Sequence, residues 1–134
     1  MTNLTPYNAI VLDHYQNPRN VGIIEEADAV GVAENSACGD ILHLYLKIDD
    51  QRVTRATFRT FGCVAAIAAG SRLTEMIVGA DLARVRQIRR QEVVEALGGL
   101  PPLKVHCSVL AEAAIRAALD DLERRRREAG RRTG

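Results

Sequence analysis

The chain has 134 residues, of which 47% are hydrophobic and 26% charged, and its formal net charge is +1 at pH 7. This length and composition are typical of one globular domain and exclude a fibrous or intrinsically disordered chain. The longest apolar run, residues 63–70, is far shorter than the roughly 20 residues of a membrane-spanning helix, so we expect no membrane partner. The first residues lack the basic start and apolar stretch of a secretory signal, which predicts a protein of the reducing cytoplasm.

The first half of the chain predicts one short helix and then an antiparallel sheet. Residues 6–16 place apolar side chains at helical spacing, and Pro18 ends the pattern because the residue before a proline disfavours helix. Between residues 29 and 61 the hydrophobic period changes to two, which predicts three strands with a hairpin turn at 49–51. The alternating positions are Val30 and Val32 in the first strand, Leu42, Leu44, Leu46 and Ile48 in the second, and Ala56 and Phe58 in the third.

The second half of the chain predicts helices. Residues 64–78 are rich in helix-forming residues, and Gly79 is a stop signal. Asp81 is placed to cap the next helical stretch, and after it Gly98 and Gly99 end the helical pattern.

The last helix follows a proline-containing connector. Residues 100–102 predict an extended segment, and Ser108 is placed as the N-cap of the last helix, with Glu112 in its first turn. A helix, three strands and then several helices predict an α+β fold in which the later helices pack on one face of a small antiparallel sheet. We expect residues 1–134 to form this single domain.

The C-terminal segment is strongly basic. Residues 123–134 contain six arginines and two glutamates, whereas the rest of the chain carries 12 basic and 15 acidic residues. A basic block this short is typical of a solvated helix end that frays. Two Phe and no Trp leave little to stack on bases, so we expect no nucleic-acid partner. A nucleic-acid binder with structural cysteines is the alternative that this segment leaves open.

Three cysteines are an odd number for a disulfide framework and favour thiol or metal chemistry. Cys38 lies in a loop before a strand, Cys63 at a strand-to-helix turn and Cys107 just before the last helix. A helix N-terminus favours the thiolate, which attacks sulfur donors and binds soft metals. Asp40 and His106, close to two of these cysteines, add further ligand types. The set suits a tetrahedral zinc site or a small cluster, although each cysteine alone is equally well explained as a small buried hydrophobe.

Several separate motifs occur in order between residue 7 and about residue 122. They are Tyr7 with DHYQNPRNVG at 13–22, ACGD at 37–40, FGC at 61–63 and LPPLKVHCS at 100–108. Together they resemble the IscU/NifU family of iron–sulfur cluster assembly scaffolds, and the chain looks like a freestanding version of the NifU N-terminal domain.

This resemblance implies a set of ligands and partners. Cys38, Cys63 and Cys107 would hold a transient 2Fe-2S cluster, with Asp40 or His106 completing the coordination. A cysteine desulfurase would supply persulfide sulfur to Cys107. Fe²⁺, a ferredoxin or another reductant, and apo-proteins that receive the cluster complete the cycle. We therefore expect a scaffold that undergoes covalent persulfide chemistry rather than an enzyme, and Zn²⁺ as a surrogate in purified protein.

The connector carries a second implied role. Its residues Leu100, Pro101, Pro102, Leu103 and Lys104 resemble the segment by which such scaffolds engage an Hsp70-type chaperone and its co-chaperone. Leu103 departs from the Val of housekeeping members and from the Glu of NifU. The alternative interpretation, without a binding role, is a rigid connector between two helices. Residues 64–71 also depart from the family pattern, with fewer hydroxyl groups after Cys63.

A zinc-dependent sulfur carrier of the SufU type is the main alternative function. That branch resembles this chain in its cysteines. It typically carries an insertion between the second and third cysteines and lacks the histidine before the last one. This chain has His106, which favours the scaffold.

Overall fold

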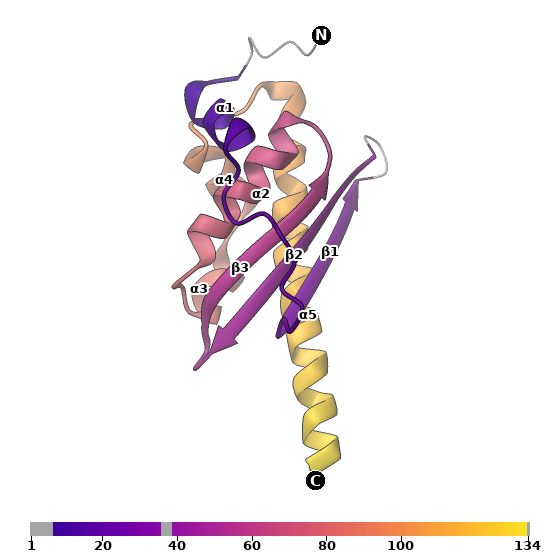
Figure 1. Ribbon diagram of the computed structural model, residues 1–134. Coiled ribbons are helices and arrows are strands. Elements are labelled where there is room, and N and C mark those ends of the chain that lie inside the picture. Colours follow the sequence, from indigo (N-terminus) through magenta and orange to yellow (C-terminus); the bar gives the residue numbers. More distant parts are fainter. Residues whose placement is uncertain (1–6, 36–38, 134) are drawn as a thin grey trace.

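The computed structural model describes residues 7–35 and 39–133, and they form three strands and a set of helices (Figure 1). In chain order the elements are α1 (Ala9–Gln16), β1 (Ala29–Asn35), β2 (Asp40–Asp49), β3 (Arg52–Phe61), α2 (Val64–Ile77), α3 (Leu82–Gln87), α4 (Arg90–Ala96), the 3-10 turn η1 (Pro102–Lys104) and α5 (Cys107–Thr133). The predicted α+β class, with a helix before a three-stranded antiparallel sheet, is confirmed.

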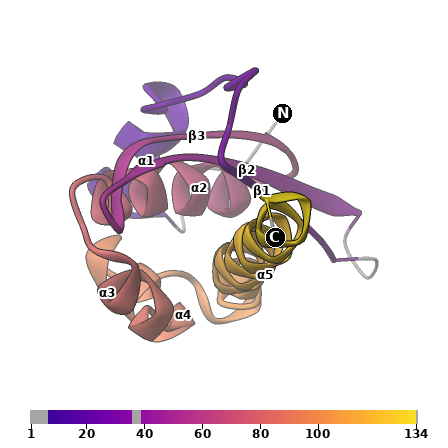
Figure 2. The same cartoon turned by 90° about the horizontal axis from the view of Figure 1, so that it is seen from below.

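The central strand of the sheet is β2, which pairs antiparallel with β1 on one side and with β3 on the other. Asp50 and Gln51 join β2 to β3, and both have positive φ (49° and 62°), as in two-residue type I′ hairpins. The predicted apolar face of β2 is confirmed, because Leu42, Leu44 and Leu46 are buried. Helices α2 and α5 cover this face of the sheet, and α3 and α4 pack on them from the side away from the strands (Figure 2).

The edge strand β1 is buried through its smallest side chains. Ala29, Gly31 and Ala33 face α5, whereas the alternating valine Val32 is exposed on the other face. A Cβ atom built on Gly31 would lie 2.2 Å from the carbonyl oxygen of Ala114 in α5. Helix and strand backbones are therefore in direct contact, which only glycine permits.

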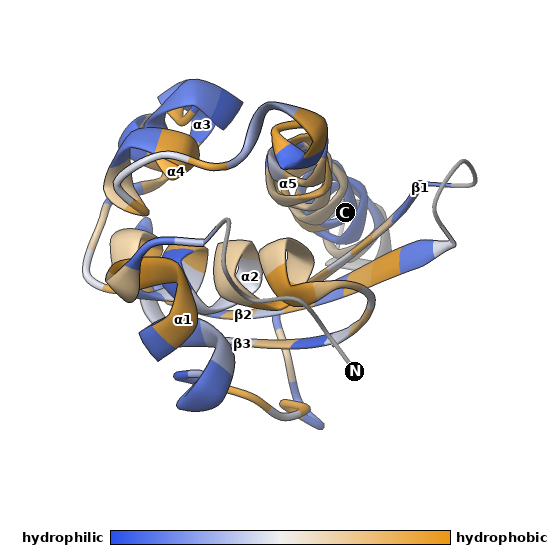
Figure 3. Ribbon diagram, turned by 90° about the horizontal axis from the view of Figure 1, so that it is seen from above, coloured by the Kyte–Doolittle hydropathy of each residue, from blue (hydrophilic) through white to orange (hydrophobic). Residues whose placement is uncertain are grey.

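The N-terminal part of the chain contacts both helix α2 and strand β3. Helix α1 packs on α2, where His14 Nδ1 lies 2.7 Å from Ser71 Oγ. Phe58 of β3 donates its backbone N–H to Asn20 and accepts from Gly22, at 2.9 and 3.0 Å. The chain then crosses the sheet face opposite α2 and α5 before it enters β1 (Figures 1 and 3).

The predicted start of the last helix is wrong. Val105 already has helical dihedral angles (φ −58°, ψ −32°), so α5 begins at Cys107 and Ser108 is its second residue rather than its cap. Glu112 is correspondingly not in the first turn. Its carboxylate instead accepts a 2.6 Å hydrogen bond from the N–H of Arg90, the first residue of α4. Glu112 thus caps a neighbouring helix.

The two ends of α5 differ in their surroundings. Before it, Pro101 is extended as predicted (φ −54°, ψ 142°), but Pro102–Lys104 closes into a 3-10 turn. After Leu122 the helix continues to Thr133 and projects beyond the sheet (Figure 1). Fraying of the segment 123–134 stays a prediction. Across the part of the chain that the structure describes, no helix combines the length and apolarity required to cross a bilayer.

Candidate metal centre

Three potential metal ligands from three separate elements converge at one end of the sheet. Asp40 is the first residue of β2, Cys63 is the N-cap of α2 and Cys107 is the first residue of α5. The two Sγ atoms lie 3.3 Å apart, and the Asp40 Oδ2 atom lies 3.7 Å from Cys63 Sγ and 3.9 Å from Cys107 Sγ. All three ligand atoms lie within 4.8 Å of one another, close enough to bind one metal ion.

The pairing of β2 with β3 explains why these side chains meet. Ile41 pairs with Phe61, so Asp40 lies beside Gly62 and next to Cys63. The backbone of Gly62 packs directly against the Asp40 carboxyl group. Asp40 and Cys107 are buried, whereas Cys63 is half-buried. The cluster is therefore reached from solvent through Cys63.

The structure does not establish a role for Cys38 or His106, the other two predicted ligands. Cys38, two residues before Asp40, lies outside the described residues. His106 is described and exposed, and its ring nitrogens are not among the converging ligand atoms. The structure thus brings Asp40, Cys63 and Cys107 together and leaves the roles of Cys38 and His106 as predictions.

The two thiols are hydrogen-bonded to each other, which changes the acidity of Cys63. The hydrogen bond with Cys107 lowers the pKa of Cys63 to about 6, against the opposing effects of burial and of Asp40. The backbone N–H of Ala66 in the first turn of α2 and the ammonium group of Lys104 also lower this pKa. Cys63 is therefore a thiolate at neutral pH, the form that binds metals and attacks sulfur.

A cavity of about 330 Å³ opens beside Cys63. Its wall consists of Tyr7, Tyr15, Gly62, Cys63, Val64, Ile67 and Lys104. The pKa of Lys104 is raised, mainly by Cys63 and then by Tyr7, and burial raises the pKa of Tyr7. Sequence reasoning missed this cavity because its residues lie in three distant segments, 7–15, 62–67 and 104. The sequence instead assigns Lys104 to the predicted chaperone-binding segment 100–104.

In the rest of that predicted segment, Pro102 and Leu103 are exposed. Leu103 is 85% exposed, whereas Leu100 is partly buried and packs against the core. A large apolar side chain this exposed is available for contact with another molecule.

Comparison with known proteins places the chain in a family. Residues 6–129 match the family of the NifU-like N terminal domain. The chain belongs to this family.

Relatives within the family are similar over most of the chain. The "Iron-sulfur cluster assembly scaffold protein IscU 1" of Archaeoglobus fulgidus is 50% identical over 119 residues, which cover 89% of this chain and 78% of that protein. The IscU scaffold protein of Haemophilus influenzae is 44% identical over 86% of this chain and 94% of its own length. That of Escherichia coli is 42% identical over 90% and 96%.

Solved structures share the fold. The N-terminal part of a NifU-like protein from Brucella abortus superimposes with a TM-score of 0.73 at 22% identity, covering 89% of this chain and 95% of the other. A putative SUF-system scaffold protein, FiSufU, from Fervidobacterium islandicum gives 0.69 at 20% identity, covering 88% and 99%. At these identities the likeness concerns the fold alone.

In this NifU-like chain the converging ligands combine two chemistries. Thiolates of Cys63 and Cys107 are soft ligands that suit iron–sulfur clusters and zinc, whereas the Asp40 carboxylate is a harder oxygen ligand. Three protein ligands leave one tetrahedral position for a further ligand. The arrangement is thus able to hold a metal ion or a cluster edge while it stays open to exchange.

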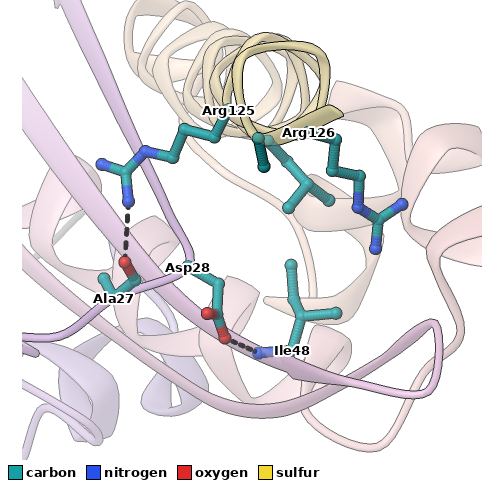
Figure 4. A pocket seen from close by; sticks show the side chains of 7 residues that line it. Ala27, Asp28, Ile48, Arg125 and Arg126 are labelled. Carbon is teal, nitrogen blue, oxygen red and sulfur yellow. Dashed lines mark hydrogen bonds between the residues drawn. The ribbon is translucent and has the colours of Figure 1, made fainter. Parts of the chain in front are cut away.

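A second cavity of about 300 Å³ lies at the opposite end of the sheet, between α5 and the strand ends (Figure 4). Arg125 donates to the carbonyl oxygen of Ala27 at 2.8 Å, and Asp28 accepts from the N–H of Ile48 at 2.7 Å. Its lining contains neither cysteine nor histidine. The thiol chemistry of the described residues is therefore confined to the other end of the molecule.

Proposed function

We propose that this chain is a scaffold on which iron–sulfur clusters are assembled and from which they are passed to apo-proteins. The observation that carries this proposal is the convergence of Asp40, Cys63 and Cys107 within 4.8 Å. Family membership supports it, because relatives 42–50% identical are named iron–sulfur cluster assembly scaffold proteins. Iron and sulfide are then the cargo of the site, not a resident cofactor.

The ligand set is completed in this proposal by Cys38 and His106. Cys38 precedes Asp40 by two residues, and His106 precedes Cys107 by one. Five candidate ligands exceed the four that a 2Fe-2S cluster takes from protein. A ligand to spare allows exchange as the cluster grows and leaves, with Asp40 as the weaker ligand.

Sulfur arrives as persulfide from a cysteine desulfurase, and Cys107 holds it for cluster building. A thiolate attacks the outer sulfur of the donor persulfide, the donor S–S bond breaks and the donor leaves as a thiolate. Two electrons from a ferredoxin or another reductant then convert this sulfur to sulfide. The chain acts as a covalent carrier in this step, and we place the process in the cytoplasm.

In this proposal, the exposed connector at residues 100–104 takes part in release of the cluster. We assign residues 100–104 as a contact for an Hsp70-type chaperone with its co-chaperone, because Leu103 is 85% exposed. A rigid, proline-containing segment loses little entropy when it binds a groove.

Anaerobic reconstitution tests the proposal. Apo-protein is incubated with Fe²⁺, cysteine, reductant and a desulfurase, and visible absorbance, bound iron and bound sulfide are followed before transfer to an apo-ferredoxin. We expect one cluster-type spectrum and its transfer, and loss of both in Cys63→Ser and Cys107→Ser. Asp120→Ala, which removes an exposed carboxylate from α5, is the control. Persulfide without bound iron and sulfide, with Zn²⁺ retained, would instead identify a SufU-like sulfur carrier.

A further inference from the structure

The two edges of the sheet are covered to different extents. At the outer edge of β3, Phe58 exchanges backbone hydrogen bonds with Asn20 and Gly22, at 2.9 and 3.0 Å. Further along the same edge, Gly79 donates its backbone N–H to the carbonyl oxygen of Val53 at 2.7 Å. The edge of β3 is therefore covered at both ends by backbone from other parts of the chain.

The other edge of the sheet is formed by β1 (Figure 1). Here the Asp121 carboxylate of α5 accepts a 2.9 Å hydrogen bond from the N–H of Val30. Because the N–H groups of successive strand residues point to alternate sides, those of Val32 and Glu34 also face away from β2. Within residues 7–35 and 39–133, no hydrogen bond engages these two N–H groups. An edge of this kind is a template for pairing with a further strand.

A cavity of about 310 Å³ lies beside this free edge. Glu34 and Asn35 line it from the strand, and Val109, Leu110 and Ala113 line it from α5. Its volume of about 310 Å³ equals that of roughly ten water molecules in the liquid. Side chains alternate between the two faces of a sheet, so every second side chain of an added strand would point toward α5. Apolar side chains at those positions would fill the cavity.

The opposite face of the same edge carries a carboxylate without a counter-ion. Glu34 is exposed, and among the described residues no salt bridge includes it. Val32, two residues earlier on the same face, is 47% exposed. Side chains that lie opposite each other on neighbouring strands interact directly. The best match is therefore a lysine or arginine opposite Glu34 and an apolar side chain opposite Val32.

A second copy of β1 fits this edge less well than a different sequence does. It would offer Gly31 and Ala33 to the face toward α5, and these residues are too small to fill the cavity. On the other face it would bring a second glutamate where a cation is required. The charge and the cavity thus favour a segment of another protein.

We propose that residues 31–34 are the docking edge for an extended segment of a partner protein. The segment adds to the sheet as a fourth strand, with apolar side chains toward α5 and a basic side chain beside Glu34. Asn35, directly after this edge, pairs with Asp40 of β2. The docked segment would therefore end one strand away from the candidate ligand cluster. This inference concerns recognition of a partner and goes beyond the proposed assembly of clusters.

A synthetic peptide tests the docking edge in the intact apo-protein. The probe is a capped hexapeptide of alternating valine and lysine, and its dissociation constant is measured by NMR titration at low salt. In the free protein the N–H groups of Val32 and Glu34 should exchange rapidly with solvent, because they are unpaired. With the peptide at about ten times its dissociation constant, we expect both to exchange about tenfold more slowly.

Control peptides and variants separate strand pairing from general attraction. A peptide N-methylated at alternate amides lacks the donors for pairing and should give no protection. A peptide with glutamate in place of lysine should bind the parent about threefold or more weakly at low salt. Glu34→Lys should reverse this preference. Glu95→Lys, which changes an exposed carboxylate on α4, should leave it as in the parent.

Three results would overturn the docking edge. One is an unchanged exchange rate of Val32 and Glu34 at millimolar probe peptide. The second is equal binding of the N-methylated peptide, which would show that no strand is added. The third is protection of both N–H groups in the free protein that increases with protein concentration, which would show that a second copy covers the edge. Each of these measurements uses the parent protein, so none depends on the folding of a variant.

Discussion

Gly62 lies so close to Asp40 that a side chain on it would collide with the carboxyl group. A Cβ atom built on Gly62 would come within 2.9 Å of both Cγ and Oδ1 of Asp40 and 3.0 Å from Cβ of Ala66. The absence of a side chain at this glycine therefore sets the place of one ligand. The strand-to-helix turn and the ligand cluster cannot be altered independently.

Gly62→Ala should displace the Asp40 carboxylate and weaken the site. We expect a loss of about 1–3 kcal/mol in unfolding free energy from overpacking and a weaker affinity for Zn²⁺, measured by urea unfolding and by competition with a chromophoric chelator. Gly130→Ala is the matched control, because a Cβ there meets nothing within 4 Å. That change, in an exposed helix, should raise stability by about 0.5–1 kcal/mol. Equal Zn²⁺ affinity in Gly62→Ala and the parent would contradict this account.

Asp40→Ala should retain an assembled cluster longer than the parent protein. A hard carboxylate oxygen is a poorer ligand for cluster iron than thiolate, so its removal lets softer ligands complete the set. We expect the half-life of the cluster absorbance after exposure to air to lengthen by about threefold or more. Asp120→Ala, an exposed carboxylate on the same protein, should leave it unchanged. Equal or faster loss in Asp40→Ala would count against a role in lability.

The reactivity of apo Cys63 should depend on pH through a low pKa. The pKa of Cys63 is lowered from 9.0 to about 6, and only the thiolate reacts with iodoacetamide. The rate at Cys63 should therefore be nearly constant above pH 7 and fall as pH drops through about 6. Cys107→Ala removes the main cause of the shift and should move the midpoint upward. A midpoint near 9 in the parent would refute the thiolate assignment.

The lowered pKa of Cys63 also makes the unfolding free energy depend on pH. Between pH 6 and pH 9 the folded protein has released the Cys63 proton while the unfolded chain still holds it. Unfolding then takes up protons, so the unfolding free energy should rise with pH over this window. Chemical unfolding of the apo-protein at several pH values, with Cys107→Ala for comparison, measures this slope. A slope that is the same in both proteins would assign the pH dependence to other groups.

Gly31→Ala should be among the most damaging single changes in the sheet. The added Cβ would lie 2.2 Å from the carbonyl oxygen of Ala114 and 2.5 Å from the backbone nitrogen of Ala118, atoms that cannot rotate away. We expect a loss of about 2–3 kcal/mol in thermal or urea unfolding. Val32→Ala, on the exposed side of the same strand, should cost less than about 1 kcal/mol. Comparable losses in the two variants would contradict the contact between β1 and α5.

Sequence patterns predicted well those elements whose signals are local. The alternation in β2, the stop at Gly79 and the cap at Asp81 each depend on neighbouring residues, and all three are found in the structure. Glu112 was misplaced because its partner, Arg90, is remote in sequence. The buried face of β1 was not apparent either, since small residues bury less apolar area than valines but allow closer packing.

The candidate site was only partly predictable, because its residues come from distant parts of the chain. The motifs identify Asp40, Cys63 and Cys107 as candidate ligands. The hydrophobic periodicity does not show which of the three side chains is exposed to solvent. The cavity depends on Tyr7 and Lys104, from opposite ends of the chain. Only the fold shows that a residue predicted to contact a chaperone also faces Cys63.

If Asp40, Cys63 and Cys107 hold the cargo as proposed, it would join the first residue of a strand to the starts of two helices and act as a reversible cross-link. While it is held, the sheet end and the starts of α2 and α5 cannot separate. When it leaves, that restraint disappears and the same end of the molecule is free to open locally. Amide hydrogen exchange in the first turns of these two helices should then slow when the cargo binds. It should return to its original rate when the cargo is transferred.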